Sequence, residues 1–475
     1  TTTVTISPSF RIRNLIRDSL SAVASSEVGY NPIRNVIDGF KAQKPDANGI
    51  SLLAGGGAIR FGVITDGDNA KHAKRLLELG IKDKDILDTR EKFGNVLRKA
   101  YDWWQLVGDK VETVNRAAIY DRAIKAGRTH LEASFEARDL MNFTSMGSAS
   151  AIRALSQVLP FFNARLQGTD RLIRGAAKDP RRFFASAGVL ALASALLYLV
   201  NHDDEDYKKL PDYVRDTYWV LRFGEKFVYV PKPFEIGAMA TVVERATELA
   251  VSGDDYKAAD FGSNLLGLLN TQLAMNPVPQ IVRPLTEAAF NYDMFRQAPI
   301  DSLGQMNLLA EDRFTSRTSG LAIAAGKATG MSPQRLEHML QGYLGWVGIQ
   351  ALNASDHAMR GAGLLPAGPQ GDLGRVSNLF VVGDFVKDSA NVSSKYVTRF
   401  YETQKELDAI YASATAARKS GDTERALELL KDPKMAVRPI FQRADKKITA
   451  INRQIRAITN HPTLSAAEKT AKLDA

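Results

Sequence analysis

Apolar residues recur every three or four positions along most of the chain, which is the spacing that places them on one face of an α-helix. The longest runs of this kind cover residues 88–127, 394–420 and 439–460. In the first run, Gly108 is expected to break the helix and Gly127 to end it, because glycine disfavours helix interiors and suits the position after a helix. The pattern predicts an all-α fold, elongated and multi-lobed.

One segment departs from the helical spacing and predicts a small β-hairpin at about residues 218–230. Residues 218–223 and 227–230 are rich in aromatic and β-branched residues, and they flank Gly224-Glu225-Lys226. A short loop with glycine between two such runs is typical of a hairpin. Pro231 and Pro233 then end the second strand, since proline cannot donate to a strand ladder.

The segment 439–460 has the most regular pattern in the chain. Its apolar residues step alternately by three and four positions, which is the heptad spacing of a helix that packs through a narrow seam. Basic residues stand outside this seam. The residues predicted to pack together along it are Phe441, Ala444, Ile448, Ile451, Ile455 and Ile458.

Residues 183–200 form an uncharged run of eighteen residues. As a helix rising 1.5 Å per residue the run would span roughly 27 Å, close to the thickness of a bilayer's hydrocarbon core. Two interpretations stay open: a helix that enters a membrane, and the central buried helix of a large helical domain. The residues that would face lipid or the core are Phe183, Phe184, Val189, Leu190, Leu192, Leu196, Leu197, Leu199 and Val200.

The stretch that precedes this run is basic, with only Asp170 and Asp179 to balance it. Cations beside an apolar helix are typical of sites that hold the phosphates of DNA or of lipid head groups. The alternative is a solvated helix surface whose arginines have local partners. The candidate phosphate or head-group contacts are Arg165, Arg171, Arg174, Lys178, Arg181 and Arg182.

Changes in composition suggest where the chain divides. Ser332-Pro333 predicts the start of a short helix that ends near Leu340, because serine caps helices and proline suits the first turn. The Gly- and Pro-rich residues 361–374 predict a linker. The chain starts without methionine and stops inside a newly capped helix, so we expect it to be part of a longer protein. The predicted regions are 1–182 (basic, helical), 183–352 (central, with the apolar helix and the hairpin), 353–390 (linker) and 391–475 (long-helix tail).

Composition and charge narrow the function further. Hydrophobic residues make up 45% and charged residues 24% of the chain, which is ordinary for a protein that buries a core. The net charge is +9, with basic ends and an acidic middle, and such ends favour an acidic partner such as DNA or anionic lipid. The chain has no cysteine, which excludes disulfides, thiolate catalysis and cysteine-ligated metals.

The sequence contains no recognised catalytic motif. Its six histidines are scattered and form no metal-ligand spacing such as H-E-x-x-H. The glycines at 55–57 are not followed by the Lys-Ser/Thr of a phosphate-binding loop, and the acidic run 203–206 lacks the glycine and distal glutamate of an EF-hand. We therefore expect no enzymatic activity, no metal and no cofactor.

Four phrases, in their order along the chain, resemble a large polyvalent protein-associated domain found in giant phage proteins. Those proteins include internal virion and DNA-ejection proteins of short-tailed bacteriophages. The resemblance covers roughly residues 7–348. The phrases are SPSFRIRNLIRD at residues 7–18, PFFNARLQG at 160–168, PKPFEIG at 231–237 followed by Glu244-Arg245, and Ser332-Pro333 followed by GYLG at 342–345.

The resemblance implies a structural subunit of a genome-ejection assembly that helps to carry DNA through the host envelope. Its place would be the capsid interior or the portal and tail channel, and after ejection the envelope. The implied partners are other copies of the chain, other phage ejection, portal or tail proteins, double-stranded DNA bound without sequence preference, and the host membrane. Two rivals remain: a membrane-active enzyme fragment, and a DNA-binding or accessory module of a giant phage virion enzyme.

Overall fold

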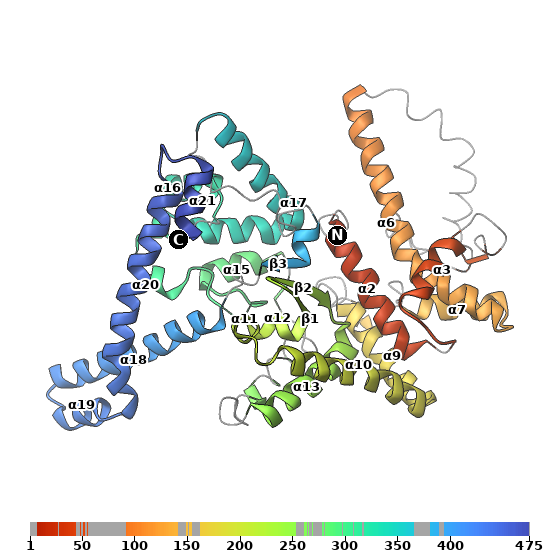
Figure 1. Ribbon diagram of the computed structural model, residues 1–475, viewed down its shortest axis with the longest axis horizontal. Helices are drawn as coiled ribbons and strands as arrows, with labels where there is room; N and C mark the ends of the chain where they lie inside the picture. The colour runs from red at the N-terminus through yellow and green to blue at the C-terminus, as the bar shows by residue number, and fades with distance from the viewer. Residues whose placement is uncertain are drawn as a thin grey trace. The chain divides into compact units, whose positions relative to one another are not determined.

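The fold is mainly helical with one small antiparallel sheet, as the spacing of apolar residues predicts (Figure 1). The structure is a computed structural model. It describes residues 7–26, 28–43, 92–140, 162–252, 281–296, 298–306, 308–315, 318–364, 381–388 and 394–474, together with a few isolated positions between them.

The chain forms two compact units. Unit 1 comprises Thr1–Lys208, Val214–Gln280 and Phe380–Ser389, and unit 2 comprises Lys209–Tyr213, Ile281–Leu379 and Ala390–Ala475. Each unit is therefore built from segments that are distant in sequence. The four-part division expected from composition stays a prediction, and residues 365–380 of its linker lie outside the described residues.

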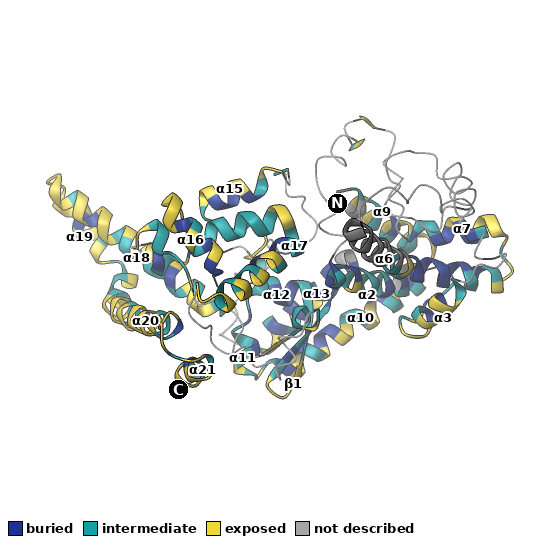
Figure 2. Cartoon of the chain, turned by 90° about the horizontal axis from the view of Figure 1, so that it is seen from above, coloured by how far each residue is buried: buried dark blue, intermediate teal, exposed yellow. Residues whose placement is uncertain are grey.

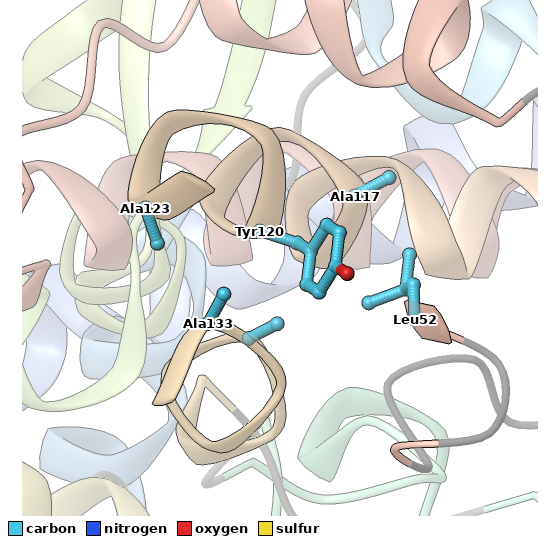
Figure 3. Close-up of a cluster of buried hydrophobic side chains, with 6 residues drawn as sticks. Leu52, Ala117, Tyr120, Ala123 and Ala133 are labelled. Atoms are coloured by element: carbon cyan, nitrogen blue, oxygen red, sulfur yellow. The ribbon is translucent and has the colours of Figure 1, made fainter. Parts of the chain in front are cut away.

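The first part of unit 1 packs around the helix α6 (Lys92–Lys125). Helices α2 (Pro8–Ser25), α3 (Arg34–Ala42) and α7 (His130–Asp139) lie against it. Tyr120 extends from α6 toward Leu52 and Ala133 (Figure 3). The buried cluster there consists of Leu52, Ala117, Tyr120, Ala123, Ala133 and Ala137, and a second cluster consists of Ala22, Tyr30, Ala118, Ile119 and Leu140.

The expected helix break at Gly108 is wrong, because α6 continues through this position. The glycine instead permits close packing: a Cβ atom there would lie 1.2 Å from Nη1 of Arg11 on α2. The expected stop at Gly127 is confirmed, since this residue follows the end of α6 with a left-handed φ of 82°. The first residues of the predicted run, 88–91, lie outside the described residues.

The second part of unit 1 contains the sheet and the apolar helix. The predicted hairpin is confirmed as β1 (Tyr218–Phe223) and β2 (Lys226–Pro231), joined by the two-residue turn Gly224-Glu225. Gly224 has a positive φ of 59°, a backbone conformation that residues with a side chain rarely adopt. A third strand, β3 (Val386–Asp388), pairs with β2 and was not expected from the sequence. The helices here are α9 (Phe162–Lys178), α10 (Pro180–Asn201), α11 (Glu205–Lys208), α12 (Asp212–Thr217, which begins in unit 2) and α13 (Phe234–Val251), with the 3₁₀ turn η7 (Val382–Asp384).

The named elements of unit 2, among its described residues, are all α- or 3₁₀ helices. Its longest helix, α17 (Pro333–Gly361), starts at the expected Ser332 cap but runs well past Leu340. The helix passes Gly345, whose backbone is non-helical with φ 56° and ψ −138°. Glycine therefore kinks α17 here without ending it. The other elements are α15 (Arg283–Phe290), η4 (Leu303–Gln305), η5 (Ala310–Asp312), α16 (Gly320–Thr329), α18 (Lys395–Lys419), α19 (Thr423–Leu430), η9 (Pro433–Val437), α20 (Arg438–Thr459) and α21 (Ala466–Asp474).

The heptad segment forms the single helix α20, and its seam residues differ in exposure. Phe441 stacks on Phe400 of α18 with ring centroids 4.9 Å apart. Ile455 is half-buried, whereas Ile451 is 54% exposed in the single chain. Helix α21 folds back on α20, with the buried Lys469 donating from Nζ to the Thr459 carbonyl at 2.9 Å. The seam is therefore covered over part of its length.

This difference predicts unequal effects of placing a charge in the seam. Ile455→Asp should lower the free energy of unfolding by about 2–4 kcal/mol, because it would partly bury an unpaired carboxylate. Ile451→Asp should cost less than about 1 kcal/mol. Urea denaturation followed by circular dichroism measures both values. Equal losses would mean that Ile451 is also covered in solution, for instance by a second copy of the chain.

Candidate functional site

Unit 1 buries six charged side chains in one network. Three are cations, Arg215, Lys232 and Arg245, and three are carboxylates, so the network is balanced in formal charge. Charged residues are seldom buried unless they are paired, because removing an ion from water costs several kcal/mol. The three carboxylates are those of Asp216, Glu244 and Glu248.

Three neighbouring elements supply these side chains. Arg215 and Asp216 come from the last turn of α12, directly before β1. Lys232 directly follows β2, so the hairpin brings it back beside them, with its backbone N–H donating to the Thr217 carbonyl at 2.9 Å. Helix α13 contributes the rest from one face, since positions 241, 244, 245 and 248 are three or four residues apart.

Glu248 is the carboxylate shared by both arginines. Arg215 donates to its two oxygens at 2.8 and 2.9 Å, which is the bidentate geometry that suits a guanidinium. Arg245 donates to the same carboxylate at 2.9 Å and to Oδ1 of Asp216 at 2.8 Å. The chain of ion pairs therefore ties α12 to α13 at two points.

Lys232 is held by three acceptors. Its Nζ donates to the Arg215 carbonyl at 2.6 Å, to Oγ1 of Thr241 at 3.0 Å and to Oε2 of Glu244 at 2.8 Å. An ammonium has three donors, so this set uses its whole capacity. The hydroxyl of Tyr207 donates to the other oxygen of Glu244 at 3.2 Å.

Two aromatic rings complete the surroundings of Arg215. Its guanidinium carbon lies 5.1 Å from the ring centroid of Tyr207 and 5.4 Å from that of Tyr198. A cation near an aromatic face is stabilised by the ring quadrupole, more so where water is excluded. Through Tyr198, the network also reaches α10.

The ion pairs overcome the effect of burial on the central pair. Burial alone would raise the pKa of Glu248, but Arg215 and Arg245 hold that pKa below its ordinary value. Burial alone would lower the pKa of Arg215, and the anionic groups around it, Glu248 among them, hold it above. Both residues therefore stay charged at neutral pH. Burial lowers the pKa of Lys232 despite the opposing effect of Glu244.

We assign this network a structural role. Its charged groups are directed at one another, while the buried Nε of Arg215 has no hydrogen-bond partner. Among the residues that the structure describes, no three His, Asp or Glu side chains gather closely enough to hold a metal ion.

Unit 2 has a comparable but smaller arrangement around the fully buried Asp301. Ser332 donates to this carboxylate at 2.5 Å and Arg335 at 2.7 Å, and Arg313 lies 3.7 Å away. A cavity of about 310 Å³ lies beside these residues and is lined mainly by apolar side chains such as Met339. Both arginines are committed to Asp301, so the cavity offers no free charge for a ligand.

Helix α10 has an unusual distribution of polar and apolar residues. Its inward face makes hydrogen bonds: Ser194 accepts from the Trp219 ring, Asn201 donates to the Val220 carbonyl at 2.9 Å, and Tyr198 lies 3.0 Å from the hydroxyl of Ser252. Its outward face is apolar. The large apolar residues exposed there are Phe184, Val189, Leu192, Leu196, Leu199 and Val200.

Helix α13, which lies beside α10 in Figure 1, repeats this distribution. Its three charged residues from position 244 onward are buried in the network, while Val243, Ala246, Ala250 and Val251 are exposed. Soluble proteins place charged residues outside and apolar residues inside. The two helices do the reverse over these faces.

Of the residues expected to contact lipid or a core, the structure separates two groups. Phe183 is buried, and Leu190 and Leu197 are half-buried, whereas the six large side chains named above are exposed. The run does form one continuous helix, α10. Among the described residues it is the one helix long and apolar enough to cross a membrane, by length and composition alone.

The basic stretch before α10 contains residues in different settings. Arg171 is buried, and its Nε lies 4.0 Å from Oδ2 of Asp139. Burial lowers the pKa of the Arg171 guanidinium to about 10. Arg174 donates to Asp139 at 2.9 Å and to Asp170 at 2.8 Å. Lys178 and Arg181 are exposed. The Arg182 guanidinium lies against Gly29, and the Arg165 side chain lies outside the described residues. Phosphate or head-group binding by this set stays a prediction.

The sequence pattern did not predict the charge network, although part of its signal is visible there. PKPFEIG and Glu244-Arg245 carried the family resemblance, but no pairing was assigned to them. The available signal was a group of charges at helical spacing within an otherwise apolar helix, residues 234–251. Such charges need partners if the helix is buried.

We predict that Glu248→Gln destabilises unit 1 by about 3–5 kcal/mol, because it leaves two buried guanidinium groups short of one charge. Glu225→Gln in the exposed hairpin turn is the matched control and should cost less than about 0.5 kcal/mol. Chemical denaturation measures both values. A loss for Glu248→Gln no larger than that of the control would refute the assigned role.

The same variant has a defined pH dependence. Because the folded-state pKa of Glu248 is depressed, its contribution to stability is present above the unfolded pKa of about 4.3 and is lost as pH falls through the folded value. The stability difference between the unaltered chain and Glu248→Gln should therefore shrink below about pH 4.

Comparison with known proteins identifies one family over part of the chain. No curated protein and no solved structure matches the chain. The network from Tyr207 to Glu248 and the Ser332 cap with Gly345 both lie in the matched region. Residues 204–374, about a third of the chain, match the family described as large polyvalent protein associated domain 38.

Proposed function

We propose that this chain is a structural subunit of a bacteriophage genome-ejection assembly that helps to carry DNA through the host cell envelope. Its partners would be other copies of itself, other phage ejection, portal or tail proteins, double-stranded DNA and the host membrane. The family match over residues 204–374 supports a large polyvalent protein associated domain. The step from that domain to a phage protein, and from there to ejection, rests on the resemblance of the four sequence phrases.

The chemistry of the described residues supports a structural role over a catalytic one. The carboxylates of Glu248 and Asp301, at the centres of the two buried networks, are held by arginine and hydroxyl partners. A general acid or base needs access to a substrate and a proton to exchange. Carboxylates locked in ion pairs hold a fold together and do not exchange protons readily at neutral pH.

The outward face of α10 is the observation that carries the proposal. From Phe184 to Val200 it covers about 24 Å without a charge, and the whole helix of 22 residues is about 33 Å long. A bilayer's hydrocarbon core is about 30 Å thick. Arg181 precedes this face and Asp203 follows it, both exposed, so charges stand at its two ends.

An apolar face of this size needs a cover in water. We infer that neighbouring copies or other virion proteins cover it while the protein is stored in the particle, and that lipid covers it in the envelope. The polar groups of α10 already have partners inside unit 1, so moving the outward face into lipid would strand none of those polar groups.

The assignment to a virion is tested by following the protein in purified particles. Mass spectrometry should detect the chain in mature particles and find it depleted from particles that have released their DNA in vitro. Major capsid protein, which stays with the shell, is the reference for loading. Absence from mature particles, or full retention after DNA release, would contradict the proposal.

Membrane contact is tested by flotation of the protein with vesicles of phosphatidylethanolamine and phosphatidylglycerol. The unaltered chain should float, and Leu192→Arg with Leu196→Arg should reduce the floating fraction severalfold, because each arginine at a lipid-facing position costs about 2.5–3.5 kcal/mol. Both leucines are exposed, so the unit should keep its fold.

The matched control places an arginine at an exposed leucine elsewhere. Leu131 on α7 is 80% exposed, and Leu131→Arg should leave flotation unchanged. Equal flotation of the α10 variant and this control would show that the face does not meet lipid and would leave coverage by protein as its role.

A further inference from the structure

Helix α20 has a basic face. Arg443, Lys446, Lys447 and Arg453 are all exposed. At about 100° per residue, these four positions fall within roughly a third of the helix circumference. The other residues on this arc are Pro439, Ala450, Gln454 and Ala457, which are also exposed. The face therefore combines four cations with small or neutral side chains and has no acidic residue.

The four cations of this face differ in their ion pairing from Lys434 and Arg438, which lie just before α20 and at its first position. Lys434 pairs with Glu406 at 2.5 Å, and Arg438 pairs with Asp408 at 3.0 Å. In the described part of the chain, no carboxylate lies within ion-pair distance of the four cations on the face. Helix α18 therefore neutralises the beginning of α20 and leaves the charge of the exposed face uncompensated.

The opposite side of α20 is occupied by packing within unit 2. Phe441 stacks on Phe400, and the Arg456 guanidinium lies over the Phe314 ring at 5.3 Å while donating to the Asp312 carbonyl at 3.4 Å. These contacts fix which side of the helix faces outward. Figure 2 shows the exposed positions running along α20.

We infer that this face of α20 binds the phosphate backbone of double-stranded DNA without reading its sequence. The cations extend over about 15 Å of helix, and duplex DNA carries one negative charge per about 1.7 Å of its axis. Ala450 and Ala457 allow the helix backbone to approach the phosphates closely. The inference names the surface for the DNA partner of the proposed function and rests on that function.

A lipid surface fits the same face less well. A helix that lies in a membrane interface buries large apolar residues beside its cations. On the basic arc of α20 the apolar residues are Pro439 and two alanines. The exposed Ile440 and Ile451 lie beside the arc and not on it, and Phe441 is committed to Phe400 on the packed side. Phosphate groups held by charge alone, as in nucleic acid, match this arrangement.

The test measures DNA affinity of the full chain against salt. The probe is a fluorescent duplex of mixed sequence, followed by anisotropy between 50 and 300 mM NaCl. The variant R443Q/K446Q/K447Q/R453Q keeps helix-forming residues and removes four charges. We expect its affinity to fall at least tenfold at the lowest salt and its log–log salt slope to shrink by about 3 to 4, because each lost phosphate contact removes about 0.9.

A control variant removes the same charge from scattered positions of unit 2. R418Q/K419Q/K431Q/K472Q changes four exposed cations on α18, α21 and the end of α19, and it should alter the slope by less than about 1. Equal loss in both variants would mean that net charge alone attracts DNA and would overturn the inference. So would an unaltered slope in the α20 variant, or no DNA binding by the unaltered chain.

A single substitution guards against loss of the fold. Ala450→Glu places one acid at the centre of the exposed face and should weaken DNA binding severalfold, whereas Ala412→Glu, at an exposed position of α18, should not. Loss of vesicle binding by Ala450→Glu, with its DNA binding unchanged, would identify the face as a lipid-binding surface instead. DNA binding by a chain absent from virions would refute the proposed function alone, and the reverse result would refute this surface alone.

Discussion

The pairing of Arg215 with Glu248 is the interaction on which the organisation of the second half of unit 1 depends. It joins the end of α12 to the last turns of α13, and Arg245 and Lys232 extend it to Asp216 and Glu244. Each of these ions would be costly to bury alone, so the network is stable only when all its members are in place. The hairpin, α12 and α13 are therefore fixed together, and the ring of Tyr198 fixes α10 against them.

This concentration of charge inside the unit explains why the outer faces of α10 and α13 can be apolar. Helices usually gain specificity from an apolar core and solubility from a polar surface. Here ion pairs and hydrogen bonds specify the inner contacts, as with Asn201 and the Val220 carbonyl. The outer face then has no part in positioning the helices, and its exposed leucines gain nothing in water. Such a face is useful only to a molecule that meets an apolar partner.

The sequence predicted what depends on neighbouring residues and missed what depends on distant ones. The hairpin follows from local spacing, and the structure has it within one or two residues of the predicted ends. Gly108 was misread because its role is set by Arg11, almost a hundred positions earlier. The strand β3 has three residues and pairs with Val228 across more than 150 positions, so no local pattern could identify it. The charge network could not be predicted from the sequence for the same reason. Glu248 stands out on its own helix, but its partner Arg215 comes from another element.

Basic residues give the sharpest case of this dependence on context. In the sequence, the stretch 165–182 is a candidate phosphate contact because it combines many cations with an apolar neighbour. In the structure, Arg171 and Arg174 have carboxylate partners on Asp139 and Asp170, so part of that charge is used to hold α9 in place. The sequence of helix α20 is less distinctive, because it shows only that its cations lie outside the heptad seam. Yet a cation that holds no carboxylate keeps its full charge for an external anion, and one that is already paired must first give up its partner. The acidic residues around each cation, which the sequence does not place, therefore decide whether a basic helix supports the fold or recognises another molecule.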